Sequence, residues 1–298
     1  NAGGPFFAFS NSSYSNSVQG FLMNDQRPGG VFNENYTYSN NQVGFIIGDC
    51  SNTMFLSNVS CTNAQYGFQR VGTANLSNLY YANRAIGGFR QQYGFSFGGG
   101  VSNLAERVIN NHSTNHYFDN FVIGGIPNGI VASNSSIFCG RYGLNLDRTS
   151  NVLIQENEVR QATNGFILQN KAFGNLLLGN RLAENSLQGL YLTSTVLSNW
   201  VIGNQITGNG SNGVLSFYSE WPNYFLSNQV HSNWRDGMRL EYQTNAVIAD
   251  NNVSSNGRYG LSFYRIHSCD IRGNTIFMGL AQKEGLHPES GCTSNTYV

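Results

Sequence analysis

The sequence has few charged residues and few prolines. Lys and Arg together number 16, Asp and Glu also number 16, and the formal net charge at pH 7 is zero. A neutral chain lacks the basic field that attracts nucleic acid, and no apolar run approaches the roughly 18 residues that a membrane span requires. We therefore expect no nucleic-acid partner and no insertion into a membrane.

Cysteine is also scarce. The 5 cysteines form no CxxC pair, which argues against a zinc site, and no metal or other cofactor is indicated. Cys269 and Cys292 lie about one repeat apart, so both a disulfide between them and two buried free thiols are open.

What the sequence does contain is a repeat. A glycine followed by an apolar residue recurs in the second half of the chain at steps of 22, 24, 24, 24 and 23 residues. The glycines of this series are Gly143, Gly165, Gly189, Gly213, Gly237 and Gly260. Similar pairs near the N-terminus begin at Gly20, Gly44, Gly67 and Gly88. A fixed period of this length is typical of a solenoid.

Apolar residues recur at three places in each repeat. The first row is read as Ile154, Leu178, Ile202, Leu226, Ile248 and Ile271. The second row is Val159, Leu182, Ile206, Val230, Val253 and Ile276. The third row follows the glycines and contains Leu144, Phe166, Leu190, Val214, Met238 and Leu261. Alternation with period two around these rows indicates three short strands per coil, and coils stacked about 4.8 Å apart bury a continuous core.

Asparagines form two further rows. One row precedes the second apolar row by two residues: Asn157, Asn180, Asn204, Asn228, Asn251 and Asn274. The other lies four residues before the glycine: Asn16, Asn40, Asn63, Asn83, Asn185, Asn209, Asn233 and Asn256. Asn tolerates the left-handed geometry of a tight turn, and stacked amides can bond along the axis. We predict an all-β fold, a single domain over residues 1–298, forming a single-stranded right-handed parallel β-helix of about 22–24 residues per coil.

The segments NVLIQENEV, NAVIADNNVSSNGRYGL and NGIVAS resemble the right-handed β-helix repeats of the pectate-lyase-like superfamily, including NosD-like and sugar-hydrolase repeats. The resemblance spans nearly the whole chain. It implies an extracellular, periplasmic or cell-surface protein with a polysaccharide cleft beside the strand that follows each glycine. The Asp-Asp, Gly-His-Gly and Arg-x-Lys elements of polygalacturonases and the Asp-Pro-His of alginate epimerases are absent, so the resemblance assigns no reaction.

The repeat is irregular in the middle of the chain. The spacings from Gly94 to Asn115 and from Gly129 to Asn151 predict adjacent loop insertions near 97–110 and 131–142, with a short helix after Ser102 or Asn103. Long loops on a rigid scaffold often carry function, but an oligomer contact or a tolerated insertion is equally open.

Outward positions on the strand after each glycine predict the binding residues. Aromatic faces stack on sugar rings, and charged groups fix hydroxyls or uronates. The predicted substrate-binding set is Asp147, Gln169, Tyr191, Phe217, Tyr218, Trp221, Tyr264 and Arg265. The alternative is that these aromatic side chains pack against a neighbouring chain.

Three residues are candidates for catalysis. Glu220 and Glu241 fall on adjacent coils, as a carboxylate pair for hydrolysis requires, and Arg239 is a candidate base for a lyase. Whether the protein is an enzyme at all stays open. If it is, a polysaccharide lyase or glycoside hydrolase is expected.

The sequence thus favours a β-helix that engages polysaccharide by binding or cleavage. The alternative is a non-catalytic structural protein of the cell envelope, a sheath or a filament, and a fragment similar to a phage tailspike is a further alternative. Exposed strand edges and the aromatic stripe favour a homo-oligomer, either a trimer or an end-to-end assembly.

Overall fold

A computed structural model describes residues 5–23, 29–72, 77–88, 90–98, 105–193, 195–219, 221–280 and 282–297. Its contacts divide the chain into two compact units. Unit 1 comprises Asn1–Asn145 and Thr149–Leu153, and unit 2 comprises Leu146–Arg148 and Ile154–Val298. All the regular structure in the described ranges is β-strand. Whether the two units form one domain stays a prediction.

Each coil of unit 1 contributes three strands. The first strands are β1 (Phe7–Phe9), β4 (Val31–Asn33), β7 (Met54–Leu56), β10 (Leu79–Tyr81), β13 (Arg107–Ile109) and β16 (Ile130–Ala132). The second strands are β2 (Ser12–Tyr14), β5 (Tyr36–Tyr38), β8 (Val59–Cys61), β11 (Arg84–Ile86) and β14 (His112–His116). The third strands are β3 (Gln19–Met23), β6 (Val43–Ile47), β9 (Tyr66–Arg70), β12 (Tyr93–Phe97) and β15 (Phe121–Gly124).

Three strands remain: β17 (Ser135–Asp147), β18 (Leu153–Gln155) and β19 (Glu158–Gln169). Sequence boundaries of the units fall within β17 and β18, and the long strands β17 and β19 each cover two strand positions of a coil.

Unit 2 repeats the same order. Its first strands are β20 (Leu176–Leu178), β23 (Trp200–Ile202), β26 (Tyr224–Leu226), β29 (Val247–Ala249), β32 (Asp270–Arg272) and β35 (Thr296–Tyr297). Its second strands are β21 (Arg181–Ala183), β24 (Gln205–Thr207), β27 (Gln229–His231), β30 (Asn252–Ser254) and β33 (Thr275–Phe277). Its third strands are β22 (Leu190–Leu192), β25 (Val214–Ser219), β28 (Met238–Gln243), β31 (Tyr259–Tyr264) and β34 (Glu284–Pro288).

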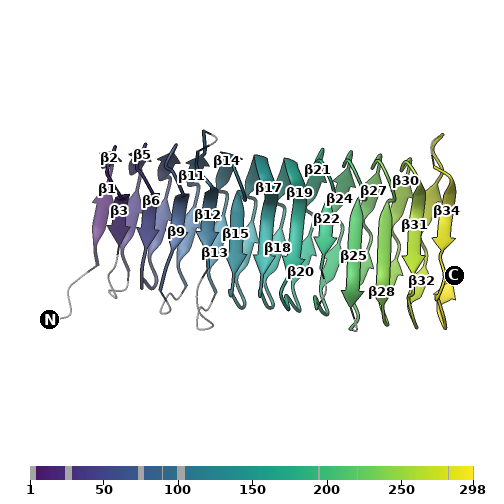
Figure 1. Cartoon of the computed structure of the whole chain (residues 1–298). Coiled ribbons are helices and arrows are strands. Elements are labelled where there is room, and N and C mark those ends of the chain that lie inside the picture. Colours follow the sequence, from purple (N-terminus) through teal and green to yellow (C-terminus); the bar gives the residue numbers. More distant parts are fainter. Residues whose placement is uncertain are drawn as a thin grey trace. The chain divides into compact units, whose positions relative to one another are not determined.

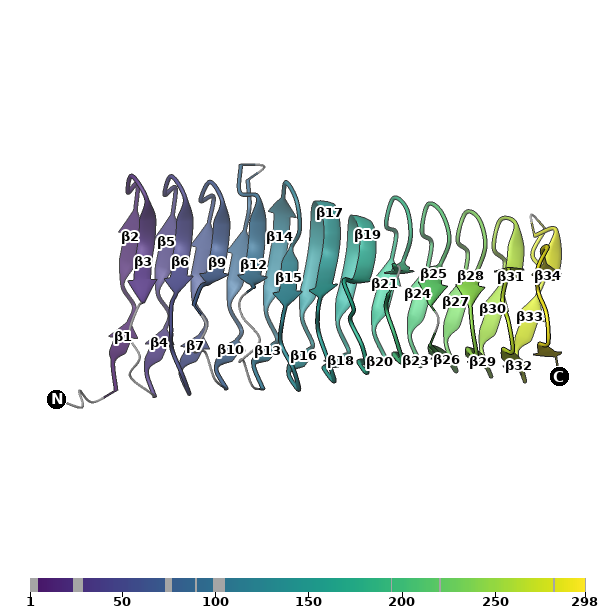
Figure 2. The same cartoon turned by 60° about the horizontal axis from the view of Figure 1, so that its bottom comes forward.

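Strands of the same kind pair in parallel from one coil to the next within each unit. In unit 2, for example, Val214 pairs with Met238 and Met238 pairs with Leu261. Figures 1 and 2 show strands of one kind following one another side by side within each unit. The predicted parallel β-helix with three short strands per coil is therefore confirmed.

The predicted asparagine ladders connect the coils by hydrogen bonds along the axis, but the left-handed residue of the turn is not the asparagine. The backbone N–H of Asn180 donates to Oδ1 of Asn204 at 2.9 Å, and the side-chain amide of Asn180 donates to the same oxygen. The left-handed residue at this turn is Gly179 (φ 63°), directly before the asparagine. The expectation that the asparagine itself takes the left-handed conformation is wrong, because its side chain serves as the acceptor for the coil before it.

One asparagine was assigned to the wrong ladder. Asn83 accepts the backbone N–H of Asn58 and belongs to the first asparagine row, the one that precedes the second apolar row. In the second row its place is taken by Gln91, which accepts from Asn63. The extra residues of this coil caused the misassignment.

The second and third apolar rows are confirmed as core. Leu190, Val214, Met238 and Leu261 are all fully buried in unit 2. In unit 1 the corresponding positions hold a stack of phenylalanines, with ring centroids of Phe45 and Phe68 4.7 Å apart.

The first apolar row is wrong by one residue in three coils. Leu177, Val201 and Phe225 are buried, whereas Leu178, Ile202 and Leu226 point outward and are partly exposed. These strands are apolar on both faces, so their alternation did not reveal which face is inside.

The repeat glycines are required by close approach of the next coil. A Cβ on Gly213 would lie 2.6 Å from the carbonyl oxygen of Gly237 and 2.5 Å from a methyl of Val230. A side chain at this position would displace a neighbouring backbone, which explains the glycine row.

The irregular middle of the chain contains one modest insertion. The coil from Asn83 to Asn111 spans 28 residues, and the next, from Asn111 to Asn134, spans 23. The predicted insertion at 131–142 is wrong, because β16 and β17 occupy that segment in register with β13 and β14. β17 covers two strand positions, which are joined at Phe138 (φ 51°). The predicted helix is also wrong at Arg107–Ile109, which is β13, while residues 99–104 lie outside the described part.

Candidate functional site

The third strands of unit 2 present two outward columns of side chains. Pairing of β25, β28 and β31 aligns Phe217 with Glu241 and Glu241 with Tyr264. The second column aligns Leu215, Arg239 and Ser262, and Tyr191 on β22 precedes Leu215. Because coils repeat about every 4.8 Å, the side chains of neighbouring coils in each column are within contact distance.

Aromatic side chains gather at the end of these strands. The ring of Tyr242 lies 5.0 Å from that of Tyr218, 5.7 Å from that of Phe217 and 5.3 Å from that of Tyr264, centroid to centroid. The guanidinium of Arg265 lies 5.2 Å from the ring of Tyr264 and 5.6 Å from that of Tyr242. We call these five residues the aromatic patch. Four of them were predicted as binding residues, and Tyr242 was missed.

A charged cluster adjoins the aromatic patch on the same strands. Nε of Arg239 donates to Glu241, and Nη1 of Arg239 lies 2.7 Å from Oε1 of Glu289 and 3.1 Å from Oγ of Ser262. Arg239 therefore spans from its own strand across the small side chain of Ser262 to the coil beyond. The predicted pair Arg239 and Glu241 is brought together. Glu289 was missed because the predicted glycine series ends at Gly260 and leaves out Gly285.

A buried aspartate completes the charged cluster. Asp236 is fully buried, and Arg258 of the next coil donates to both its oxygens, from Nε at 2.7 Å and from Nη2 at 2.6 Å. The same arrangement occurs in unit 1, where Arg141 donates to both oxygens of the fully buried Asp119 at 2.7 Å. The charged cluster is thus Asp236, Arg239, Glu241, Arg258 and Glu289.

The charges of the cluster stabilise one another. Burial disfavours the cationic form of Arg239, but its hydrogen bonds to Glu289 and Glu241 outweigh this and raise its pKa. The hydrogen bond from Arg239 lowers the pKa of Glu289. The hydrogen bond with Tyr242 and partial desolvation raise the pKa of the Tyr264 hydroxyl. All three groups therefore keep one protonation state over the neutral range.

Two surface hollows of unit 2 adjoin these residues. One, of about 310 Å³, is lined by Gln188, Ser211, Asn212, Leu215, Arg235, Arg239, Glu241 and Arg258. The other, of about 490 Å³, is lined by Lys171, Phe173, Thr195, Leu197, Tyr218 and Trp221. The first is lined by three residues of the charged cluster, Arg239, Glu241 and Arg258. The second continues the aromatic patch through Tyr218 to the exposed ring of Trp221.

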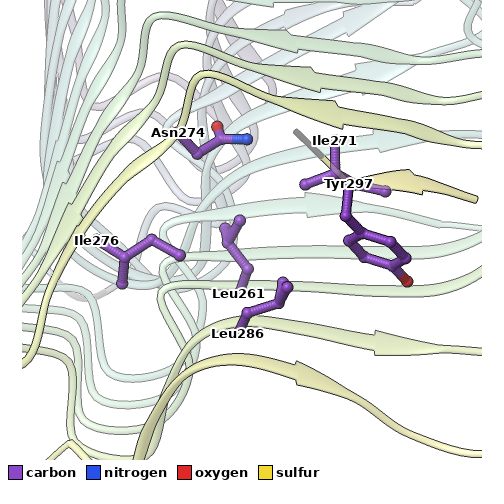
Figure 3. A pocket seen from close by; sticks show the side chains of 6 residues that line it. All are labelled: Leu261, Ile271, Asn274, Ile276, Leu286 and Tyr297. Atoms are coloured by element: carbon purple, nitrogen blue, oxygen red, sulfur yellow. The ribbon is translucent and has the colours of Figure 1, made fainter.

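A third hollow lies at the last described coils of unit 2. It measures about 280 Å³ and is lined by Leu261, Ile271, Asn274, Ile276, Leu286 and Tyr297. Figure 3 shows Leu261, Ile276 and Leu286 directed toward one another in this hollow. Apart from one asparagine and one tyrosine hydroxyl its lining is apolar, and it offers few groups that would recognise a polar ligand.

The remaining predicted residues lie on earlier coils or outside the described part. Asp147 pairs with Arg148 at 3.1 Å and accepts from Asn170 at 2.7 Å, and Gln169 ends β19. Glu220 lies outside the described residues, so its predicted pairing with Glu241 is untested.

Three further features bear on the site. Cys269 and Cys292 are both free thiols, of which Cys269 is buried and Cys292 is half-buried. Among the described residues, no cluster of three or more His, Cys, Asp or Glu side chains forms a potential metal site. Within the same ranges, no helix has the length and apolar character to cross a membrane.

Comparison with known proteins identifies the class. A family model described as "Right handed beta helix region" matches residues 142–298, more than half of the chain, and the chain therefore belongs to this family. The predicted right-handed parallel β-helix is confirmed. No curated protein sequence matches the chain at a significant level.

Several solved structures share the fold. The A-module of the mannuronan C-5 epimerase AlgE4 of Azotobacter vinelandii superposes with a TM-score of 0.81 and 16% identity, covering 99% of this chain and 91% of that one. The periplasmic alginate epimerase AlgG gives a TM-score of 0.63 and 14% identity over 90% of this chain and 78% of that one. An alginate lyase from a Paenibacillus species gives 0.53 and 11% identity, covering 82% of this chain and 92% of that one. At these identities the likeness concerns the fold.

Proposed function

We propose that the outer face of the third strands in unit 2 binds a polysaccharide chain. The observation that carries the proposal is the aromatic patch, in which Tyr218, Tyr242 and Tyr264 from three successive coils contact one another on the surface. Aromatic rings contribute about 0.5–1.5 kcal/mol per well-packed contact, and their faces match the apolar face of a pyranose. The adjoining charged cluster supplies acceptors for sugar hydroxyls.

The structural neighbours support this proposal through the fold they share. One is named as a mannuronan C-5 epimerase, one as an alginate epimerase and one as an alginate lyase, so this kind of β-helix serves proteins that act on polysaccharides. AlgG is named as periplasmic. We accordingly propose an extracellular, periplasmic or cell-surface location for the present protein.

Binding, rather than cleavage, is the activity that the geometry favours. Arg239, a predicted base, donates to two carboxylates and has a raised pKa, so it does not accept a proton near neutral pH. Glu241 is the residue we assign to any hydrolytic role. Release of reducing ends or of unsaturated sugars from a polysaccharide panel, abolished by Glu241→Ala, measures this activity directly.

A panel of soluble polysaccharides in affinity electrophoresis tests the binding proposal. Retardation of the wild-type protein in at least one polysaccharide gel, lost when Tyr242 and Tyr264 are changed to alanine, is the expected result. The same mobility in every gel and in buffer would reject it. Thermal melting of both proteins verifies that the variant is folded.

A second candidate function is supported by the first strands of unit 2. Their outward side chains are almost all apolar from Leu176 and Leu178 through Trp200 and Ile202 to Tyr224 and Leu226. Strands that are apolar on both faces are typical of sheets covered on both sides. We propose that this face supports lateral self-association, as a structural surface protein or homo-oligomer requires. Light scattering measures the oligomeric state of the wild type and of Ile202→Asp. A monomeric wild type would reject the proposed self-association.

A further inference from the structure

We propose that the glycan recognised by unit 2 is uncharged where it crosses the charged cluster, so that a neutral polysaccharide is bound in preference to a polyuronate. This inference rests on the proposed function and narrows its substrate class. It derives from the way Arg239 and Arg258, the two arginines of the charged cluster, are paired with carboxylates of the protein.

Arg239 has no free edge for a carboxylate ligand. Its Nε donates to Glu241, and its Nη1 faces Glu289 at 2.7 Å, Ser262 at 3.1 Å and Asp236 at 3.6 Å. Its Nη2 lies 3.4 Å from the second oxygen of Glu289. A bidentate bond to a uronate needs two parallel N–H groups of one guanidinium, and both such edges are taken by protein carboxylates.

Arg258 is occupied in the same way. Its Nε and Nη2 hold the buried Asp236, and its guanidinium lies 4.8 Å from the ring of Tyr259. Removing Arg258 from Asp236 would leave a buried carboxylate with only the longer contact to Arg239 at 3.6 Å, which costs several kcal/mol. A sugar carboxylate therefore cannot recruit the Nε edge of Arg258.

The electrostatic balance around the hollow is close to zero. Arg235, Arg239, Arg258 and Glu241 line the hollow, and Asp236 and Glu289, which pair with Arg258 and Arg239 outside its lining, bring the count to three charges of each sign. Arg235 is exposed and belongs to none of these pairs. Each ring of a polyuronate carries one negative charge, and a neutral patch offers no net attraction to such a chain.

The exposed groups suit hydroxyls instead. The side chains of Glu241 and Glu289 keep 18% and 26% of their surface exposed, so their remaining lone pairs face solvent. Gln188, Ser211 and Asn212 line the same hollow and both donate and accept. A hydroxyl-rich neutral ring can satisfy these groups while its apolar face lies on Tyr264 or Tyr242.

The test compares wild-type binding to neutral polysaccharides, such as galactomannan and xyloglucan, with binding to alginate and polygalacturonate. We expect neutral polymers to bind with less than about a twofold change in affinity between low and high salt, because no net charge is neutralised. Preferential binding of the polyuronates overturns the inference and leaves polysaccharide binding intact. Absence of binding to every polymer overturns the proposed function together with the inference.

A second, independent experiment measures a gain of affinity. The double change Glu241→Gln and Glu289→Gln frees Arg239, and we expect it to raise affinity for polygalacturonate about fivefold, the value of one exposed ion pair. The matched control, Glu158→Gln with Glu184→Gln, removes two carboxylates from another turn of unit 2 and is expected to change this affinity far less. Equal effects of the two double variants contradict the inference.

Discussion

Nη1 of Arg239 lies 2.7 Å from Oε1 of Glu289, although the two residues are 50 positions apart in the sequence. Arg239 is in β28 and Glu289 follows β34, so the pair connects two coils across the one between them, which contributes Ser262. This relationship determines the character of the surface, because it converts an arginine that looks available in the sequence into one that is already bound.

Removing one ring of the aromatic patch should weaken glycan binding without unfolding the protein. Tyr242 touches three other rings of the patch, so Tyr242→Ala is expected to cost about 1 kcal/mol, or about fivefold in affinity. Phe277, which is 62% exposed on a second strand of unit 2, is the matched control. Isothermal titration calorimetry with the best-bound polymer measures the affinity of both variants. Equal losses of affinity would contradict a role of the aromatic patch in binding.

Breaking the asparagine ladder should destabilise unit 2. Asn204 is 2% exposed, accepts two hydrogen bonds from Asn180 and donates to the carbonyl of Leu177 at 3.0 Å. Asn204→Ala leaves these buried groups unpaired, and we expect a loss of about 2–4 kcal/mol in the free energy of unfolding. Denaturant titration measures the loss. The exposed Asn252 serves as control, since Asn252→Ala should change stability by less than about 0.5 kcal/mol.

The repeat glycine should tolerate no side chain. Gly213→Ala places a Cβ within 2.6 Å of the backbone of the next coil, and a loss of at least about 2 kcal/mol is expected. A Cβ added to Gly203 would meet no atom within 4 Å, but the φ of +63° is strained for alanine. Gly203→Ala should therefore lower the free energy of unfolding by about 1 kcal/mol. If thermal melts show the reverse order, close approach of the coils does not explain the glycine row.

Stability of unit 1 should fall as the pH rises through 7. Burial raises the pKa of Glu106 to about 7 from its ordinary value of 4.5, despite Arg70 at 3.5 Å and Asn78 at 3.2 Å. The folded state therefore holds its proton more tightly than the unfolded state. The contribution of Glu106 to the free energy of unfolding is complete below about pH 4.5 and is lost as the pH rises through the pKa of the folded state. The loss is at most about 3 kcal/mol.

The isosteric change Glu106→Gln should flatten this pH dependence between pH 5 and 8. The change Glu34→Gln at an exposed site of unit 1 should leave it unaltered. Melting temperatures of the three proteins across this range provide the comparison. An unchanged slope in Glu106→Gln would show that another group causes the pH dependence.

The coil architecture was predictable from the sequence because it depends on repeated residues. Glycine steps, the second and third apolar rows and the asparagines each recur once per coil, and their physical roles act between neighbouring coils. The prediction of the first apolar row was wrong at Leu178, because the strands LLL, WVI and YFL contain no polar residue that would mark the outer face. The prediction for segment 131–142 was wrong because β17 joins two strand positions at Phe138 (φ 51°), a residue type that does not mark a turn in a sequence.

The site was predictable only where it follows the repeat. Phe217, Glu241 and Tyr264 were found because they occupy one outward column. Glu289 was missed because the predicted glycine series ends at Gly260, although Gly285 precedes Glu289 by four positions, the offset that also places Glu241 and Tyr264. The two aspartate–arginine pairs share a signal that was available: an Arg-Tyr dipeptide, at Arg141 and Arg258, follows each buried aspartate by 22 residues.

The most direct test of the account is the affinity of the wild type and of the double variant Tyr242→Ala, Tyr264→Ala for a neutral polysaccharide. The account predicts measurable binding by the wild type and at least about a twentyfold loss in the double variant, with unchanged melting temperature. Equal affinity of the two proteins, or a wild type that binds no polysaccharide, would contradict it.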